Sequence, residues 1–223
     1  MSLSLSLPAS ELCSYVSRQL NHLFPDSHRV RARAISNAVS AALSRFEVCF
    51  TPARPSRFRD GNSVNFNHLY SDQYLVFLWL LSNEVYVSSQ NRMLADKLYC
   101  CNKALHAFDC IYSNRLPAHF MVIHGVGTVL GNADYSDYFV AYHGSTVGQN
   151  AGVYPRFGRG VGLGTGASVL GKSVIGDNVS IGAGVTLVAK TVQEGHAVWR
   201  NKEGIITASA HKAHSISREY FEF

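Results

Sequence analysis

The chain has 223 residues, a formal net charge of +5 and 47% hydrophobic residues. This length suits one large or two modest domains, and the hydrophobic content is ample for a packed core, which argues against disorder. Lysine and arginine are scattered along the sequence, whereas a nucleic-acid-binding protein would show a basic stripe or patch. A mildly basic surface suits an anionic small molecule, and it is equally compatible with no such ligand.

The sequence predicts a cytosolic protein with reduced thiols. Its five cysteines form no CxxC pair that would suggest a zinc site. The first twelve residues lack the basic and apolar regions of a signal peptide. The apolar stretch 74–81 is too short to cross a bilayer, so we expect no membrane span.

The first half of the chain is predicted to be helical. Apolar residues recur at helical spacing, first at Leu12, Val16 and Leu20, and then from Val30 to Phe46. Proline and glycine interrupt this pattern before two further apolar segments. The expected elements are a frayed tail over residues 1–8, helices from about residue 10, from 30 to 47, from 67 to 82 and from 92 to 112, and a loop over 51–65.

A change in composition marks a domain boundary near Leu116–Pro117. Fifteen of the eighteen glycines fall between Gly125 and Gly184. In the same region an apolar residue recurs at every sixth position, which fits neither an α-helix nor a plain strand. The repeating positions are Phe157, Leu163, Val169, Ile175, Ile181 and Leu187, with a second small or apolar series at Val161, Ala167, Ser173, Val179 and Val185. Period six predicts a parallel β-helix, in which these residues point inward and stack from coil to coil.

The repeat is less regular on either side of this stretch. Upstream, six-residue spacing continues through Ile123, but Tyr135 breaks the aliphatic rule. The register shifts between Val147 and Phe157, which predicts a loop projecting from a corner of the prism, where such proteins place functional groups. Residues 201–223 form a polar tail whose conformation the sequence leaves open.

Over residues 116–199 the sequence resembles the left-handed β-helix acyltransferases, and in particular the serine acetyltransferase-like branch. The resemblance implies a helical N-terminal domain at 1–115, a β-helix at 116–200 and a tail at 201–223. It also implies a homotrimer that binds acetyl-CoA in clefts between neighbouring prisms, with no metal. Whether trimers pair further through their helices stays open.

The segment VIHGVGTVLG, residues 122–131, resembles the catalytic coil of that family and places His124 at the catalytic histidine. Transfer of an acetyl group to a hydroxyl needs a base with a near-neutral pKa, and histidine suits this role. Backbone N–H groups of Gly144 or Ser145 are candidates for stabilising the oxyanion. The resemblance also implies that Asp109 orients the imidazole; alternatively Asp109 ends a helix.

The acceptor side departs from the family pattern. Asp72 resembles an acidic acceptor-binding residue, or is a solvated carboxylate. However, Ile123 stands where the serine enzymes have an aspartate, and Val153 and Tyr154 stand where they have arginine and histidine. Loss of such polar contacts disfavours the original substrate. We therefore expect a different acceptor, a sugar or sugar nucleotide of polysaccharide biosynthesis. The candidate acceptor-binding residues are Asp72, His143 and Tyr154, with Tyr138 and Tyr142 as further stacking groups.

The donor side matches the family better. Small residues let the thin pantetheine arm lie close to the prism, and two basic residues suit the phosphates. The candidate coenzyme-binding residues are Gly144, Thr165, Gly166, Ala183, Gly184, Arg200 and Lys202.

Three alternatives stay open from the sequence. Serine O-acetyltransferase activity in cysteine biosynthesis is the first. The second is a metal enzyme of the γ-carbonic anhydrase kind, for which His119, His124 and His143 are candidate ligands. The third is a trimeric scaffold without catalysis.

Overall fold

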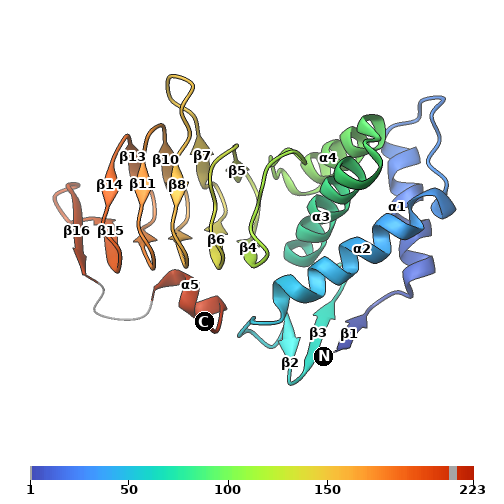
Figure 1. Ribbon diagram of the computed structural model, residues 1–223, viewed down its shortest axis with the longest axis horizontal. Helices are drawn as coiled ribbons and strands as arrows, with labels where there is room; N and C mark the ends of the chain where they lie inside the picture. Colours follow the sequence, from blue (N-terminus) through green and yellow to red (C-terminus); the bar gives the residue numbers. More distant parts are fainter. Residues whose placement is uncertain (1, 211–214) are drawn as a thin grey trace.

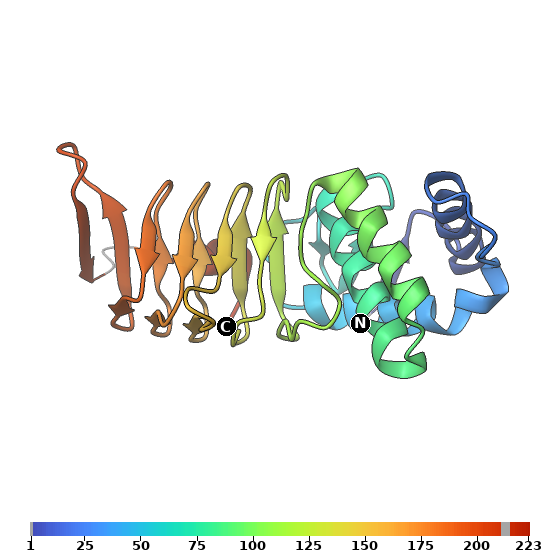
Figure 2. The ribbon, with the colours of Figure 1, turned by 90° about the horizontal axis from the view of Figure 1, so that it is seen from above.

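The computed structural model describes residues 2–210 and 215–223. It has a helical region at one end and a parallel β-solenoid at the other (Figures 1 and 2). Seen from above, the coils of the solenoid stack in a row, and the strands β15 (His196–Arg200) and β16 (Ile206–Ala210) lie at the end farthest from the helices. Within the described residues, no helix is long and apolar enough to cross a membrane.

Four helices form the N-terminal region, as the apolar spacing predicts. They are α1 (Ala9–Leu23), α2 (Ala32–Phe50), α3 (Ser71–Ser89) and α4 (Arg92–His106). Helix α3 is packed between α2 and α4, and most of its residues are buried. This burial is why α3 is apolar on all sides. Helix α4 ends earlier than expected because Ala107 adopts a left-handed φ of 51° that an α-helix does not accommodate. From Ala107 onward the chain already pairs with the first coil of the solenoid.

A small sheet joins the N-terminus to the segment that follows α2. Strand β1 (Ser2–Leu5) pairs in parallel with β3 (Ser63–Phe66), which in turn pairs with the short antiparallel strand β2 (Arg59–Asp60). The prediction of a frayed tail is therefore wrong. Leu3 and Leu5 pack against the core, and this burial holds the N-terminal segment in place.

The solenoid has three faces of short parallel strands. Each coil contributes one strand to a face, so hydrogen bonds run between successive coils. Among the described strands of the solenoid, β16 alone pairs antiparallel, with β15. The first face comprises β4 (Phe120–Ile123), β6 (Phe139–Tyr142), β9 (Gly162–Leu163), β12 (Ser180–Ile181), β15 and β16. The second comprises β5 (Val129–Leu130), β7 (Thr146–Gly148), β10 (Ser168–Leu170) and β13 (Thr186–Val188), and the third β8 (Arg156–Phe157), β11 (Val174–Ile175) and β14 (Thr191–Val192).

The six-residue repeat builds the interior of the solenoid. Every residue of both repeating series from Phe157 to Leu187 is buried, which confirms the predicted inward positions. Tyr135, which breaks the aliphatic rule, also contributes to the interior. Its ring stacks on Phe157 with centroids 5.4 Å apart, and its hydroxyl donates to the carbonyl of Gly131. An aromatic ring thus takes an interior position in this coil without interrupting the stack.

The expected loop lies between β7 and β8 and projects from the solenoid in Figure 1. A hydrogen bond from the Gly152 N–H to the Gln149 side chain tightens its tip. The chain then returns through Tyr154, which packs beside Gly131.

The C-terminal segment 215–223 connects the two parts of the molecule. Helix α5 (Ile216–Tyr220) lies on the first face of the solenoid, where the Ile216 N–H donates to the Ser180 hydroxyl at 2.9 Å. Its other end reaches the loop after α2, where the Arg54 N–H donates to the Tyr220 carbonyl. Phe221 is fully buried at this junction. Figure 1 shows α5 between the solenoid and this loop.

Candidate active site

Asp72 is a buried carboxylate where the helical region meets the solenoid. It lies in the first turn of α3, where the positive end of the helix dipole favours a negative charge. Its side chain is only 1% exposed. Burial raises the pKa of this carboxyl, while the nearby His124, its backbone N–H and the Tyr70 hydroxyl partly oppose the shift.

His124 lies beside Asp72 at the corner that follows β4. Its backbone N–H donates to Asp72 Oδ1 at 2.9 Å, and its Nδ1 lies 3.8 Å from Asp72 Oδ2. His124 has a φ of 53°, a left-handed conformation that is costly for a residue with a Cβ. The hydrogen bond to Asp72 stabilises this conformation. The imidazole itself is 65% exposed and faces outward.

His143 occupies the equivalent position one coil further on. Strands β4 and β6 pair so that Ile123 is opposite Tyr142, and the next residue of each coil is a histidine. The two imidazoles have centroids 6.2 Å apart. Nδ1 of His143 is buried and has no hydrogen-bond partner among the described residues. The site therefore holds two neighbouring imidazoles, tilted by 53° to each other, with one carboxylate at its end.

The predicted coenzyme-binding residues continue the same column. Pairing of β6 with β9, β9 with β12 and β12 with β15 places Thr165, Ala183 and Arg200 in line after His143. The next residues along this corner, Gly144, Gly166 and Gly184, all have φ between 65° and 69°. Arg200 folds back so that its guanidinium donates to the carbonyls of Gly204 and Gly184. Lys202 is exposed beyond it.

A pair of tyrosines borders the histidines. The hydroxyls of Tyr142 on β6 and Tyr220 on α5 lie 2.5 Å apart. Burial and the neighbouring hydroxyl raise the pKa of Tyr142, so its phenol stays protonated at neutral pH. The C-terminal segment therefore forms one wall next to the column.

Asp109 is placed differently from the sequence expectation. Its carboxylate accepts hydrogen bonds from the Tyr99 hydroxyl at 2.6 Å and the Lys103 ammonium at 2.8 Å. These contacts tie α4 to the first coil. The carboxylate beside His124 is Asp72, which comes from a helix that sequence spacing could not place.

The backbone N–H groups of Gly144 and Ser145 are also engaged elsewhere. The Gly144 N–H donates to the Val126 carbonyl at 2.9 Å, and the Ser145 N–H donates to the Tyr142 carbonyl at 3.2 Å. Both bonds close the corner of the prism, so this structure does not present either group as an oxyanion donor.

The remaining aromatic candidates are packing residues. Tyr138 is stacked between the Phe223 ring, 4.3 Å away, and His119, 4.9 Å away. Tyr154 covers Gly131 and lies close to Tyr135. The structure therefore brings neither Tyr138 nor Tyr154 to the histidine pair.

His119 does not join the other two histidines in a metal site. Its Nδ1 faces the Asp137 carboxylate at 3.2 Å. Across residues 2–210 and 215–223, no three His, Cys, Asp or Glu side chains are arranged to hold a metal ion.

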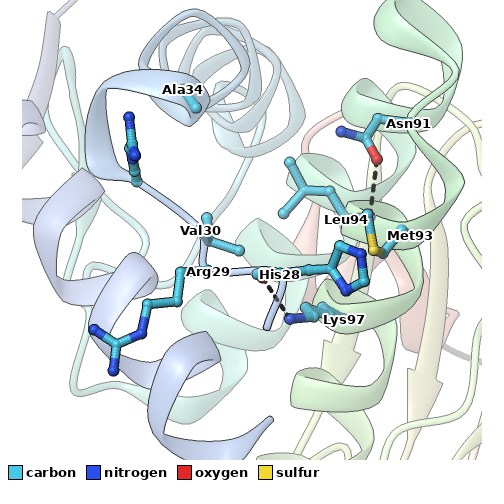
Figure 3. A pocket seen from close by; sticks show the side chains of 9 residues that line it. His28, Arg29, Val30, Ala34, Asn91, Met93, Leu94 and Lys97 are labelled. Atoms are coloured by element: carbon cyan, nitrogen blue, oxygen red, sulfur yellow. Dashed lines mark hydrogen bonds between the residues drawn. The ribbon is translucent and has the colours of Figure 1, made fainter. Parts of the chain in front are cut away.

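A separate pocket of about 280 Å³ lies between α4 and the segment joining α1 to α2 (Figure 3). Lys97 at its base donates to the His28 carbonyl, and Asn91 caps α4 by accepting from the Leu94 N–H. None of the predicted site residues lines this pocket.

The alignment of His124 and His143 on successive coils was not predicted from the sequence, although both were candidate site residues. Each follows the last residue of a strand, and their positions differ by nineteen residues. This is close to one coil of three six-residue repeats, because the repeat is less regular in this upstream region. Aligning the coils through Ile123 and Tyr142 would have shown both histidines at one corner.

Comparison with known proteins identifies the fold as the left-handed β-helix with a helical N-terminal region. The serine acetyltransferase of Neisseria gonorrhoeae superposes with a TM-score of 0.69 at 23% identity, covering 94% of this chain and 81% of that chain. The Brucella abortus strain S19 serine acetyltransferase in complex with coenzyme A gives a TM-score of 0.69 at 19% identity, covering 94% and 85%. Soybean serine acetyltransferase complexed with serine gives 0.67 at 22% identity, covering 91% and 85%.

The fold is thus the one seen in the serine acetyltransferases, which confirms the predicted fold class. In sequence, a serine acetyltransferase of Synechococcus elongatus is 41% identical over 75 residues, which is 31% of this chain and 31% of that relative. The match therefore spans less than a third of the relative's length. No protein-family model matches the sequence.

These comparisons contradict the expected sugar acceptor. The sequence relative and the structures named above are serine acetyltransferases, which favours the serine alternative. The sequence argument relied on missing polar residues at fixed positions. It gave less weight to Asp72, which α3 brings next to His124.

Proposed function

We propose that this chain is a serine O-acetyltransferase that transfers the acetyl group of acetyl-CoA to the hydroxyl of serine. The observation that carries the proposal is the column that begins at Asp72 and continues through His124, His143 and Thr165. It joins an anionic acceptor end to a row of small residues suited to the pantetheine arm. The match to a serine acetyltransferase over 75 residues supports the same activity.

The order of residues along the column suggests how the substrates meet. The buried carboxylate of Asp72 suits the ammonium group of an amino acid. Three bonds separate that ammonium from the serine hydroxyl, and adjacent coils lie about 4.8 Å apart. The hydroxyl of a serine held at Asp72 therefore points along the column toward His143, next to the coenzyme end.

His143 is accordingly our proposed general base, which moves the sequence-based assignment from His124 by one coil. The imidazole takes the proton from the serine hydroxyl while the oxygen attacks the thioester carbonyl. The tetrahedral intermediate then collapses, the C–S bond breaks, and the imidazolium returns the proton to the leaving thiolate. The products are O-acetylserine and free coenzyme A. His124, held by Asp72, completes the acceptor end of the site.

Arg200 and Lys202 are proposed to meet the phosphates of the coenzyme, because both are basic and exposed at the far end of the column. We also propose that the chain forms a homotrimer, since the outward-facing column gains a second wall from a neighbouring prism. A measurement of molecular mass in solution tests this assembly.

The test of the function is serine-dependent release of coenzyme A thiol by the wild type, His143→Asn and His124→Asn. We expect His143→Asn to lower kcat by roughly 10²–10⁴-fold while acetyl-CoA binding, measured by calorimetry, is retained. If His124→Asn shows the greater loss in kcat, the base is His124. If the wild type releases no thiol with serine, the proposed activity is refuted.

A further inference from the structure

The loop after α2 is fastened to the first turn of α3, directly beside Asp72. Gln73, the residue after Asp72, is only 1% exposed. Its side-chain nitrogen donates to the Arg57 carbonyl at 2.7 Å, and its oxygen accepts from the Asn67 N–H at 2.6 Å. This buried clasp fixes the backbone of Arg57 next to the acceptor end of the column.

The side chain of Arg57 lies over an aromatic path that leads to Asp72. Its guanidinium carbon is 5.1 Å from the centre of the Phe58 ring, within the range of a cation–π contact. The Phe58 ring lies 5.9 Å from Tyr70, whose hydroxyl donates to Asp72 Oδ2 at 3.3 Å. Arg57 is exposed, and within the described residues it forms no ion pair.

The charge of Arg57 acts on the groups around the acceptor end. Burial raises the pKa values of Asp72, Tyr70 and Tyr142, and in all three the positive charge of Arg57 opposes that shift. These residues come from the start of α3 and from β6. Together with the contacts that run through Phe58 and Tyr70, this brings the charge of Arg57 close to the acceptor end of the column.

We propose that Arg57 binds the α-carboxylate of the acceptor amino acid, while Asp72 receives its ammonium group. This assignment rests on the proposed function and adds the group that selects the acceptor. A zwitterionic amino acid needs one anionic and one cationic partner, and a planar guanidinium binds a carboxylate through two parallel hydrogen bonds. A sugar hydroxyl would need neither charge.

The proposal accounts for the unexpected residue at the projecting loop. In the serine enzymes that this chain resembles, an arginine is expected near Val153, and its absence suggested a loss of serine binding. Arg57 supplies a guanidinium from the helical region instead. A carboxylate-binding group is thus present at the acceptor end, although it comes from another part of the chain.

The test compares serine with serinamide, in which a neutral amide replaces the carboxylate, as acceptors for wild type, Arg57→Gln and Arg57→Lys. We expect Arg57→Gln to lower kcat/KM for serine by roughly 10–100-fold, mainly through KM, because a charge-assisted contact is lost. Serinamide should be a poor acceptor for both wild type and Arg57→Gln. The preference for serine over serinamide should therefore largely disappear in Arg57→Gln. Arg57→Lys should fall between them, because the charge stays and the second hydrogen bond is lost.

The matched control is Arg33→Gln, which removes the same charge from an exposed arginine of α2. Arg33→Gln should leave the preference for serine unchanged. The affinity for acetyl-CoA should stay the same in every variant. The ratio of the two acceptors is measured within each preparation, so partial misfolding does not change it. If Arg57→Gln keeps the wild-type preference for serine, the role of Arg57 is refuted while the proposed activity stands. If the wild type itself does not acetylate serine, both are refuted.

Discussion

The carboxylate of Asp72 and the backbone of His124 meet across 52 residues of sequence, through a hydrogen bond of 2.9 Å. One end of this contact belongs to a helix and the other to a corner of the solenoid. The contact therefore sets the position of the helical region relative to the histidines. It also places an ionisable group in a nearly dry environment, where a charge is costly.

Replacing Asp72 with asparagine should separate stability from activity. Because burial raises the carboxyl pKa in the folded protein, folding favours the protonated form. The carboxyl's contribution to stability is thus fullest at acidic pH below its ordinary pKa, and it is lost as the pH rises through the folded-state pKa. Asparagine keeps an acceptor for the His124 N–H and carries no charge. We expect Asp72→Asn to be at least as stable as wild type at neutral pH, with kcat/KM for serine reduced by roughly 10–100-fold.

Thermal unfolding from pH 3 upward measures the first effect. The advantage of Asp72→Asn over wild type should grow with pH across the acidic range and then level off. Asp60→Asn, at an exposed position of β2, is the control and should show no such trend. A variant that loses stability at neutral pH would contradict the argument.

Filling the column at Ala183 should block the coenzyme. This residue is exposed and follows Thr165 in line along the corner. A tryptophan there would occupy the space proposed for the pantetheine arm, so we expect Ala183→Trp to raise the Kd for acetyl-CoA roughly ten-fold or more. Calorimetry measures this change. Thr186→Trp, an equally exposed change on β13 of another face, should leave the affinity unaltered.

Phe221 should be important for stability. It is fully buried between the loop after α2 and the solenoid, with its ring 5.5 Å from Tyr138. Truncating a buried phenylalanine costs about 3–5 kcal/mol. We expect Phe221→Ala to lower Tm by several degrees or more in thermal melts. Ile205→Ala, at a side chain that is 61% exposed, should change Tm very little.

The cysteines should divide sharply in their reactivity. Cys100 is exposed, whereas Cys13, Cys49, Cys101 and Cys110 are buried. Burial raises the pKa of Cys49, Cys101 and Cys110 to about 12, so they remain protonated and unreactive near neutral pH. A thiol reagent should modify one cysteine rapidly in the folded protein and all five after denaturation. Rapid modification of a second thiol would show that part of the core opens.

The solenoid was predictable because its signal is local and repeated. Each hexad from Phe157 to Leu187 indicates the same inward position, so one irregular coil does not obscure the pattern. The helices were predictable from their apolar spacing. The short strand β1 was missed because its partner, β3, lies about sixty residues away in the sequence.

The candidate site was predictable in its residue types but only partly in its arrangement. The alignment of Thr165, Ala183 and Arg200 could be predicted from the spacing of the coils, because the register repeats from one coil to the next. The partner of His124 was not encoded locally. Asp109 is nearer in sequence, yet Asp72 makes the contact because the packing of α3 against β4 brings it there.

The C-terminal segment 215–223, which connects the two parts of the molecule, has a consequence for biosynthesis. Arg54 donates to the Phe221 carbonyl across 167 residues, so the two partners leave the ribosome far apart in time. The helices and the coils form mainly contacts between neighbours and can assemble as they emerge. In contrast, the site where Phe221 packs, between the loop after α2 and the solenoid, stays empty until the whole solenoid has been synthesised. We therefore expect the wall beside the histidines to be the last part to form, so that a nascent chain becomes active only after its synthesis has passed this segment.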